Sequence, residues 1–207
     1  MIVELMRRRR TVRAFRPDQV PDEVLRRLVE AAGLAPSAAN KQPWRFLVVR
    51  DPGTIEAAAR ETEAELALLQ AQVAEEFQGE LTAYSRQFVS LRGAPALVVP
   101  IFRPLPGMSL LLAQPPDPAL VVRMRDLESH AALVSVAMAI QNMLLVAEEL
   151  GIGACCATAP LVAAKRLAAL LDVPEGWQIA ALVAVGYPAE EPQDPGRKPV
   201  SLILKWK

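Results

Sequence analysis

The 207-residue sequence has few of the side chains that build metal centres or disulfide frameworks. It contains one histidine and two cysteines, and the cysteines, Cys155 and Cys156, are adjacent. Adjacent cysteines rarely bridge and there is no Cys-x-x-Cys, so we expect two reduced, buried thiols. One histidine without closely spaced cysteines or carboxylates is too little for a zinc site. The sequence therefore predicts no metal site.

Sequence motifs of several large enzyme classes are also missing. The chain has no Gly-x-Gly-x-x-Gly, Gly-x-x-x-x-Gly-Lys-Ser/Thr, His-Glu-x-x-His or Gly-x-Ser-x-Gly, and the Gly-Ile-Gly at 151–153 is interpreted as a helix stop. His130 lies in an apolar stretch, where a structural or interface role is expected. Because no acid/base pair stands out, an enzyme with this sequence would rely on a cofactor for its chemistry.

The chain has neither an excess of charge nor a long hydrophobic run. Lysine plus arginine equals aspartate plus glutamate, 23 against 23. A nucleic-acid binder is usually basic. No stretch reaches the roughly 18 to 20 uninterrupted apolar residues that cross a bilayer, and the N-terminus lacks a secretory pattern. We therefore expect a cytoplasmic protein with no nucleic-acid or membrane partner.

Apolar residues make up 52% of the chain, enough for one domain over residues 1–207 with a full core. Periodicity and end signals predict an α+β or α/β domain with a small sheet. The stretch 126–150 is apolar on nearly every side, which indicates burial against a second subunit. Helices are expected at 2–9, 21–34, 54–77, 81–91, 126–150 and 160–171, strands at 45–51, 94–102 and 177–188, a short strand or loop at 153–159, and an extended proline-rich loop at 103–118.

Three segments of the chain resemble the nitroreductase-like flavoprotein family. Residues 7–49 hold an Arg-x-Thr-x-Arg-x-Phe segment, a helix and a Pro-Ser-x-x-Asn-x-Gln-Pro-Trp loop; residues 139–156 and 181–199 are similar to the family's central helix and its last core strand with a basic tail. The resemblance implies a three-layer α/β/α fold with a small, mostly antiparallel central sheet flanked by helices. It also implies an intertwined homodimer.

The resemblance implies an FMN-dependent NAD(P)H oxidoreductase. FMN would lie at the subunit interface, NADH or NADPH would deliver a hydride to flavin N5, and a nitroaromatic, quinone or related small-molecule acceptor would follow in a ping-pong reaction. Two alternatives stay open. One is a specialised flavoenzyme of the same fold, such as a dehalogenase, a flavin-fragmenting enzyme or a peptide-modifying dehydrogenase. The other is a non-enzymatic protein whose basic N-terminus binds nucleic acid or an acidic partner.

The resemblance also implies the cofactor-binding residues, and no catalytic side chain, since the flavin carries the chemistry. Arg9 and Thr11 match positions that hold the FMN phosphate and ribityl chain, Arg13 faces flavin N1 and the C2 oxygen, and Arg197 closes on the phosphate. Arg10 adjoins this set. The remaining positions are a loop that reaches the flavin, usually from the partner subunit, and a backbone segment near N5 and O4: Pro36, Ser37, Ala38 and Asn40, then Cys156, Ala157 and Thr158.

The alternation of the arginine-rich segment fits one phosphate. In an extended chain Arg9, Thr11 and Arg13 lie on one side and Arg10 and Val12 on the other. An arginine fork binds a phosphate through two charge-assisted hydrogen bonds.

Two regions have no clear family counterpart: 55–77, where residues that contact the flavin are expected, and the proline-rich 103–125 segment, which we interpret as a wall or lid.

Overall fold

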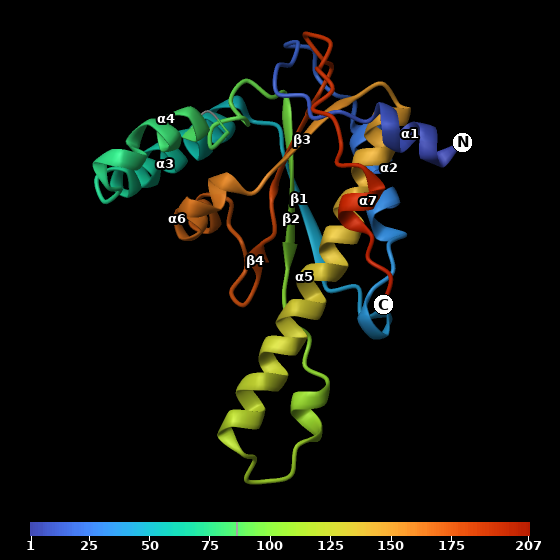
Figure 1. Cartoon of the computed structure of the whole chain (residues 1–207), viewed down its shortest axis with the longest axis vertical. Coiled ribbons are helices and arrows are strands. Elements are labelled where there is room, and N and C mark those ends of the chain that lie inside the picture. The colour runs from blue at the N-terminus through green and yellow to red at the C-terminus, as the bar shows by residue number, and fades with distance from the viewer. Residues whose placement is uncertain (86) are drawn as a thin grey trace.

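A computed structural model describes residues 1–85 and 87–207. Its centre is a five-stranded sheet with the order β1-β2-β5-β3, and β4 pairs with β2 (Figure 1). Every ladder between these strands is antiparallel. The strands are β1 (Trp44–Val49), β2 (Ala96–Phe102), β3 (Gly153–Ala157), β4 (Gln178–Ile179) and β5 (Leu182–Gly186).

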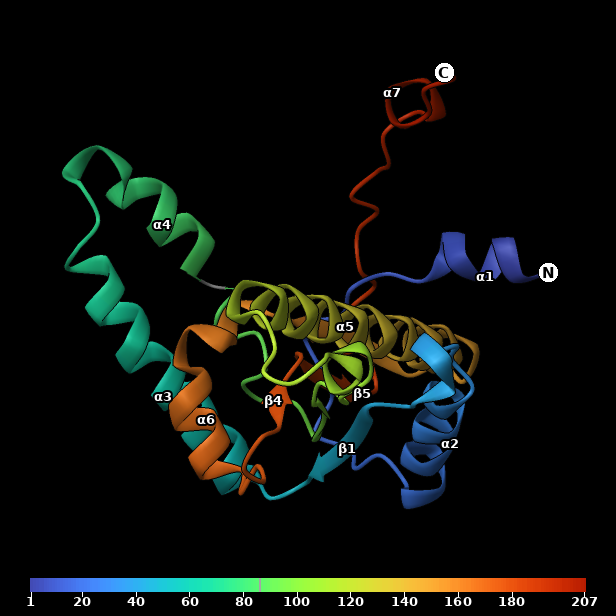
Figure 2. The ribbon, with the colours of Figure 1, turned by 90° about the horizontal axis from the view of Figure 1, so that it is seen from below.

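Helices cover both faces of the sheet, which gives three layers. The helices are α1 (Ile2–Arg8), α2 (Asp22–Gly33), α3 (Pro52–Gln70), α4 (Gln78–Ser85), α5 (Pro118–Glu149), α6 (Ala164–Leu170) and α7 (Val200–Ile203). One buried cluster joins the sheet to α2 and α5, and a second joins its other face to α3 and α6 (Figure 2). The predicted α/β/α fold with a small antiparallel sheet is therefore confirmed.

The central strand β2 explains the continuous apolar run in its sequence. Val98 and Phe102 belong to the cluster on the α2 and α5 side, whereas Leu97, Val99 and Ile101 belong to the other. Side chains alternate along a strand, so a strand covered on both faces must be apolar at every position. All seven residues of β2 are accordingly buried.

The long helix α5 starts eight residues before the predicted start at 126. Pro118 occupies its first turn, and the Asp117 side chain accepts a hydrogen bond from the Ala119 amide at 2.9 Å. Proline is well tolerated in a first helical turn because its missing amide hydrogen has no partner there. The proline-rich run therefore ends in a capped helix start, and Gly151, with φ +69°, follows the far end as expected.

The predicted helix over 54–77 is wrong in its last seven residues, 71–77. Helix α3 ends at Gln70, and the Gln78 side chain donates to the carbonyls of Gln70 (2.8 Å) and Val73 (2.9 Å). An amide side chain from eight residues away thus satisfies the end of the helix, and local sequence carries no such signal. The helix expected at 81–91 is α4, which ends at Ser85. The α3–α4 pair extends away from the sheet (Figure 2).

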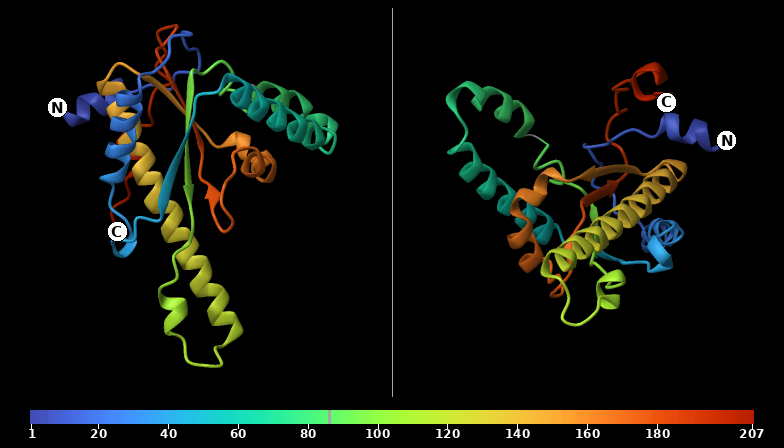
Figure 3. Two further views of the ribbon diagram at one scale, coloured as in Figure 1. Left: turned by 180° about the vertical axis from the view of Figure 1, so that it is seen from behind. Right: turned by 60° about the horizontal axis from the view of Figure 1, so that its bottom comes forward.

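Three further predictions need smaller corrections. The helix expected from 160 begins with a 3₁₀ segment, Ala159–Ala163, before α6. The strand expected over 177–188 is divided into β4 and β5. The final residues project from the body of the chain and include α7, although a tail without a helix was expected (Figure 3).

Within the described residues, α5 is the one helix long and apolar enough to cross a membrane. Its most apolar 18-residue window has a mean hydropathy of 1.7, and half of that window is buried inside the chain. Large apolar side chains on its remaining surface are exposed, among them Leu133 (45%), Val134 (44%) and Met138 (37%).

Candidate cofactor site

The arginine-rich segment lies along the free edge of the sheet, beside β3. Thr11 forms a parallel bridge with Ala154, and the Val12 amide donates to the Ala154 carbonyl at 3.0 Å. Gly153 makes this approach possible, since a Cβ there would stand only 2.7–2.9 Å from three atoms of Val12. The segment is held by this bridge and by one between Phe15 and Pro188, and so it is extended without forming a regular strand.

The arginines of this segment fall into two groups. Arg7, Arg8 and Arg10 each pair with an acid, namely Glu4 (3.5 Å), Glu148 (3.8 Å) and Asp194 (2.7 Å). By contrast, the guanidinium groups of Arg9 and Arg13 have no hydrogen-bond or ion-pair partner among the described residues. Arg9 is half-buried and Arg13 is exposed, so both guanidinium groups can take an external anion without breaking a contact to the described residues.

The side chains of the segment border two neighbouring hollows, and the predicted alternation is seen in them only in part. Arg8, Arg10 and Val12 line one hollow together with Glu148 and Asp194. Thr11 and Arg13 border a neighbouring hollow, whose other wall is the chain from 190 to 195. Val12 and Asp194 border both hollows, and Arg9 borders neither. Arg10 borders a different hollow from Thr11 and Arg13 and is held by Asp194.

Strand β3 brings Cys156 and Ala157 to the same edge, and Thr158 follows directly. Cys155 is buried and its Sγ lies 3.7 Å from the Ser90 Oγ, whereas Cys156 is exposed. The prediction that both thiols are buried is therefore wrong for Cys156, because neighbouring side chains on a strand face opposite sides.

Cys156 is poorly suited to act as a thiolate. Loss of hydration near neighbouring protein atoms, with a smaller contribution from Cys155, raises the pKa of its thiol to about 11, although the charge of Arg9 acts in the opposite direction. The thiol therefore stays protonated at neutral pH.

The loop after α2 has an unusual backbone that is fixed by hydrogen bonds within the chain. Ala39, Asn40 and Gln42 all have positive φ (51°, 52° and 46°). The Ser37 Oγ accepts from the Gln42 amide at 2.9 Å, and the Ala38 amide donates to the Ser135 Oγ on α5 at 3.3 Å. Non-glycine residues with positive φ are strained and persist where surrounding contacts fix them. Pro36, Ala38 and Asn40 are exposed on this loop.

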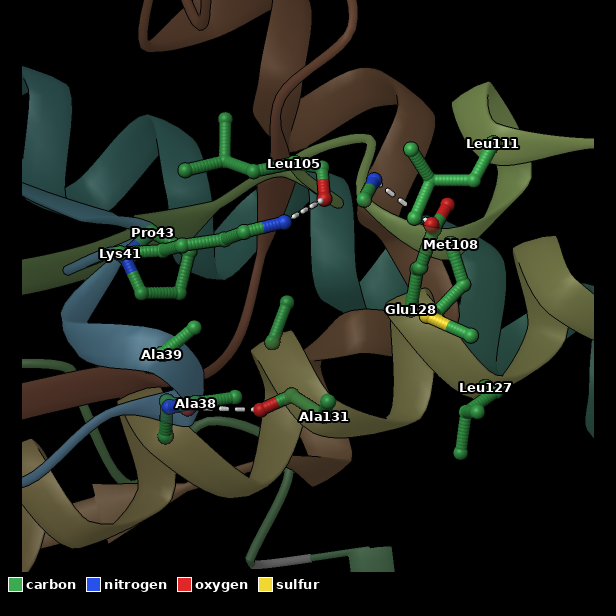
Figure 4. A pocket seen from close by; sticks show the side chains of 13 residues that line it. Ala38, Ala39, Lys41, Pro43, Leu105, Met108, Leu111, Leu127, Glu128 and Ala131 are labelled. Atoms are coloured by element: carbon green, nitrogen blue, oxygen red, sulfur yellow. Dashed lines mark hydrogen bonds between the residues drawn. The ribbon is translucent and has the colours of Figure 1, made fainter.

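A cavity of about 420 Å³ lies beside this loop, between it, α5 and the segment after β2 (Figure 4). Its walls are mainly apolar, including Pro43, Leu105, Met108, Leu111 and Leu127. Leu105, Met108 and Leu111 come from the proline-rich segment, for which the sequence predicts no role beyond that of a wall or lid, whereas Pro43 belongs to the Gln-Pro-Trp loop and Leu127 to the helix expected at 126–150.

Two charged side chains fix the segment that closes the cavity. Lys41 Nζ donates to the Leu105 carbonyl at 3.0 Å (Figure 4). It also donates to the Pro106 carbonyl at 2.9 Å. On the other side, Glu128 Oε1 accepts from the amides of Gly107 (2.7 Å) and Ser109 (3.0 Å). These hydrogen bonds from Ser109 and Gly107, together with the charge of Lys41, lower the pKa of Glu128.

The Glu128 carboxylate should therefore make the cavity wall pH-sensitive. A lowered pKa means that its stabilising contribution is present above the usual glutamate pKa and lost as the pH falls through the folded-state value. We expect the Gly107 and Ser109 amides to exchange hydrogen roughly tenfold faster in Glu128→Ala at neutral pH, since charge-assisted hydrogen bonds are lost. Hydrogen-exchange mass spectrometry measures this. Glu149→Ala, at an exposed glutamate of the same helix, should leave that exchange unchanged.

The predicted site residues form two groups in one chain. Arg9, Thr11, Arg13, Cys156 and Thr158 gather at the β3 edge, whereas the 36–40 loop lies at the opposite end of α2 (Figure 1). The chain passes the N-terminal segment again at 190–195, but Arg197 is exposed and its Nη1 donates only to the Gly196 carbonyl, at 2.6 Å. No cluster of metal-ligating side chains occurs among the described residues.

The chain matches known proteins along nearly its whole length. The NADH dehydrogenase of Thermus thermophilus is 34% identical over 204 residues, which cover 97% of this chain and 93% of that protein. The 5,6-dimethylbenzimidazole synthase of Rhodospirillum rubrum is 32% identical over 184 residues, covering 88% and 80%. A crystal structure of oxidized iodotyrosine deiodinase bound to FMN and 3-iodo-L-tyrosine superposes with a TM-score of 0.76 at 25% identity, covering 100% and 99%. The nitroreductase family model matches residues 6–187, and the chain therefore belongs to the nitroreductase family.

Proposed function

We propose that this protein is an FMN-dependent oxidoreductase that takes electrons from NADH or NADPH and reduces a small nitroaromatic, quinone or related acceptor. The observation that carries the proposal is that some arginines of the N-terminal segment are paired with acids and others are not. Three of the five at positions 7–13 are paired with acids, and Arg9 and Arg13 are left unpaired beside Thr11 at the β3 edge. A dianionic phosphate with a polyhydroxyl chain fits that donor set.

FMN, when bound, supplies the electron-accepting centre of the reaction. The residues of this chain then have binding and electrostatic roles. Arg9 and Thr11 would hold the phosphate end, Arg13 would place a positive charge near the flavin, and the backbone of 156–158 would border it. A cation near a reduced, anionic flavin lowers its energy. The relative solved with FMN supports this choice of cofactor.

We also propose that the functional unit is a homodimer. The 36–40 loop is too far along α2 to join the β3 edge of its own chain, so a second copy would bring it to the cofactor. Two unpartnered apolar surfaces support this assembly: the exposed flank of α5, and the C-terminal segment with Val200 (65%), Leu202 (69%) and Trp206 (89%). Such exposed apolar surfaces commonly mark interfaces between proteins.

The experiment is an anaerobic titration of FMN-saturated protein with NADH and, separately, with NADPH. We expect at least one of them to bleach the visible flavin absorbance, and a nitroaromatic or quinone to restore it. Free FMN at the same concentration is the control. Protein-bound flavin that neither nucleotide reduces would contradict the proposal.

A second candidate is a specialised reaction on the same fold. It is favoured by relatives of different chemistry, the dimethylbenzimidazole synthase and the deiodinase, which match most of this chain. In that case the nucleotide or another reductant would still reduce the flavin, but nitroaromatics and quinones would not restore its absorbance faster than buffer does.

A further inference from the structure

Two arginines and a tryptophan gather at the end of the sheet away from the β3 edge. In the β2–β4 ladder Phe102 is opposite Gln178, so the next pair places Arg103 beside Trp177. In the β1–β2 ladder Arg45 is opposite Ile101, and the Arg103 amide donates to the Pro43 carbonyl at 3.2 Å. The register therefore brings side chains from three strand ends onto one face of the sheet.

Both guanidinium groups stack on the same indole ring. The Arg45 Cζ lies 4.6 Å from the centroid of the Trp177 ring and the Arg103 Cζ lies 5.1 Å from it. The two charges are thus within about 10 Å of each other. Trp177 is half-buried and packs on the α3 and α6 cluster, whereas both arginines are exposed. The ring is fixed by the core and in turn orients the two cations.

These two cations have no counter-charge within the described part of the chain. Neither Arg45 nor Arg103 forms a hydrogen bond or an ion pair with a carboxylate there. The acid nearest in sequence to the ring, Glu175, is exposed and makes no ion pair with them. Elsewhere, Arg92 and Arg166 are each paired with two glutamates. Two adjacent guanidinium groups that are not paired with a carboxylate give this part of the surface a local positive charge, which favours binding of an anion.

We propose that Arg45, Arg103 and Trp177 form a binding site for a phosphoryl group, separate from the cofactor site. Two guanidinium groups from neighbouring strands can approach one anion from different directions. A tetrahedral phosphate offers oxygens in several directions and carries close to two negative charges, whereas a carboxylate is planar and is satisfied by one arginine. Stacking on Trp177 limits the motion of both guanidinium groups, so less side-chain entropy is lost on binding. The phosphate is either free or carried by a nucleotide such as NADPH.

Isothermal titration of FMN-saturated protein with inorganic phosphate tests the site. We expect saturable binding that weakens roughly tenfold or more in Arg45→Gln and in Arg103→Gln. Arg123→Gln, at an exposed arginine of α5 that has no partner among the described residues, is the matched control and should bind like the wild type. Trp177→Phe keeps an aromatic surface and should retain binding, whereas Trp177→Leu should weaken it.

Further titrations identify the molecule that carries the phosphate, and they distinguish this site from the cofactor site. If NADP⁺ binds more tightly than NAD⁺ and this difference disappears in Arg103→Gln, the site exists and its natural ligand is a nucleotide phosphate. If inorganic phosphate and 2′,5′-ADP bind equally tightly, the site exists and its ligand is free phosphate. Flavin absorbance and the melting temperature report whether each variant is folded. Phosphate binding that is absent, or unchanged in folded Arg45→Gln and Arg103→Gln, overturns the proposal. Binding lost only in Arg9→Ala overturns it too, whatever the outcome of the nicotinamide titration.

Discussion

Arg9→Ala is expected to weaken FMN binding by at least about a hundredfold. Arg9 has no hydrogen-bond or ion-pair partner within the described part of the chain and stands two residues before the bridge between Thr11 and Ala154 of β3, so its guanidinium is available to meet the phosphate. Removing two charge-assisted hydrogen bonds of roughly 1.5 kcal/mol each changes a dissociation constant by about two powers of ten. Quenching of flavin fluorescence during titration of the apoprotein measures the affinity.

The matched control for this variant is Arg7→Ala. Arg7 belongs to the same basic run, but it pairs with Glu4 and is exposed. If the run acted only by its total positive charge, both variants would lose affinity equally. We expect Arg7→Ala to bind FMN within about threefold of the wild type, because exposed surface pairs contribute little. Equal losses in the two variants would refute the role given to Arg9.

Gly153→Ala is expected to lower stability by about 1–3 kcal/mol and to impair FMN binding as well. The added methyl group would stand 2.7 Å from Cγ1, 2.8 Å from Cβ and 2.9 Å from Cγ2 of Val12. Rotation about χ1 cannot relieve a clash with Cβ itself, so the backbone of the arginine-rich segment must move away from β3. Thermal unfolding should show a decrease of roughly 2 to 10 °C for a chain of this length.

The control for this substitution is Gly33→Ala at the end of α2. No atom lies within 4 Å of a Cβ at that position. Alanine favours helix more than glycine does, so the free energy of unfolding should stay within about 1 kcal/mol of the wild type. A Gly153→Ala protein that melts and binds FMN like Gly33→Ala would show that the close approach to Val12 is not required.

The structure confirms those predictions that depend on local pattern. The helix of 22–33 follows from an apolar face formed by Leu25, Leu28 and Ala32, and β2 follows from its valine-rich run. Predictions fail where a distant side chain decides. Gln78 ends α3 early, and the Asp117 cap starts α5 inside a run read as a loop. The cavity lined by Leu105 and Met108 is formed by segments that no periodicity connects.

By itself the sequence determined the mixed helix-and-strand class, because apolar periodicity sets the buried faces of helices and strands. The layered fold and the family followed from the resemblance of three segments, 7–49, 139–156 and 181–199, to the nitroreductase-like family. Only the tertiary structure decided which arginines remain available. Arg8 meets Glu148 and Arg10 meets Asp194 across more than a hundred residues of chain, and Arg45 and Arg103 share the ring of Trp177. The physical reason is that a charge is neutralised by whatever the fold places within a few ångströms of it, and sequence spacing does not specify that neighbour.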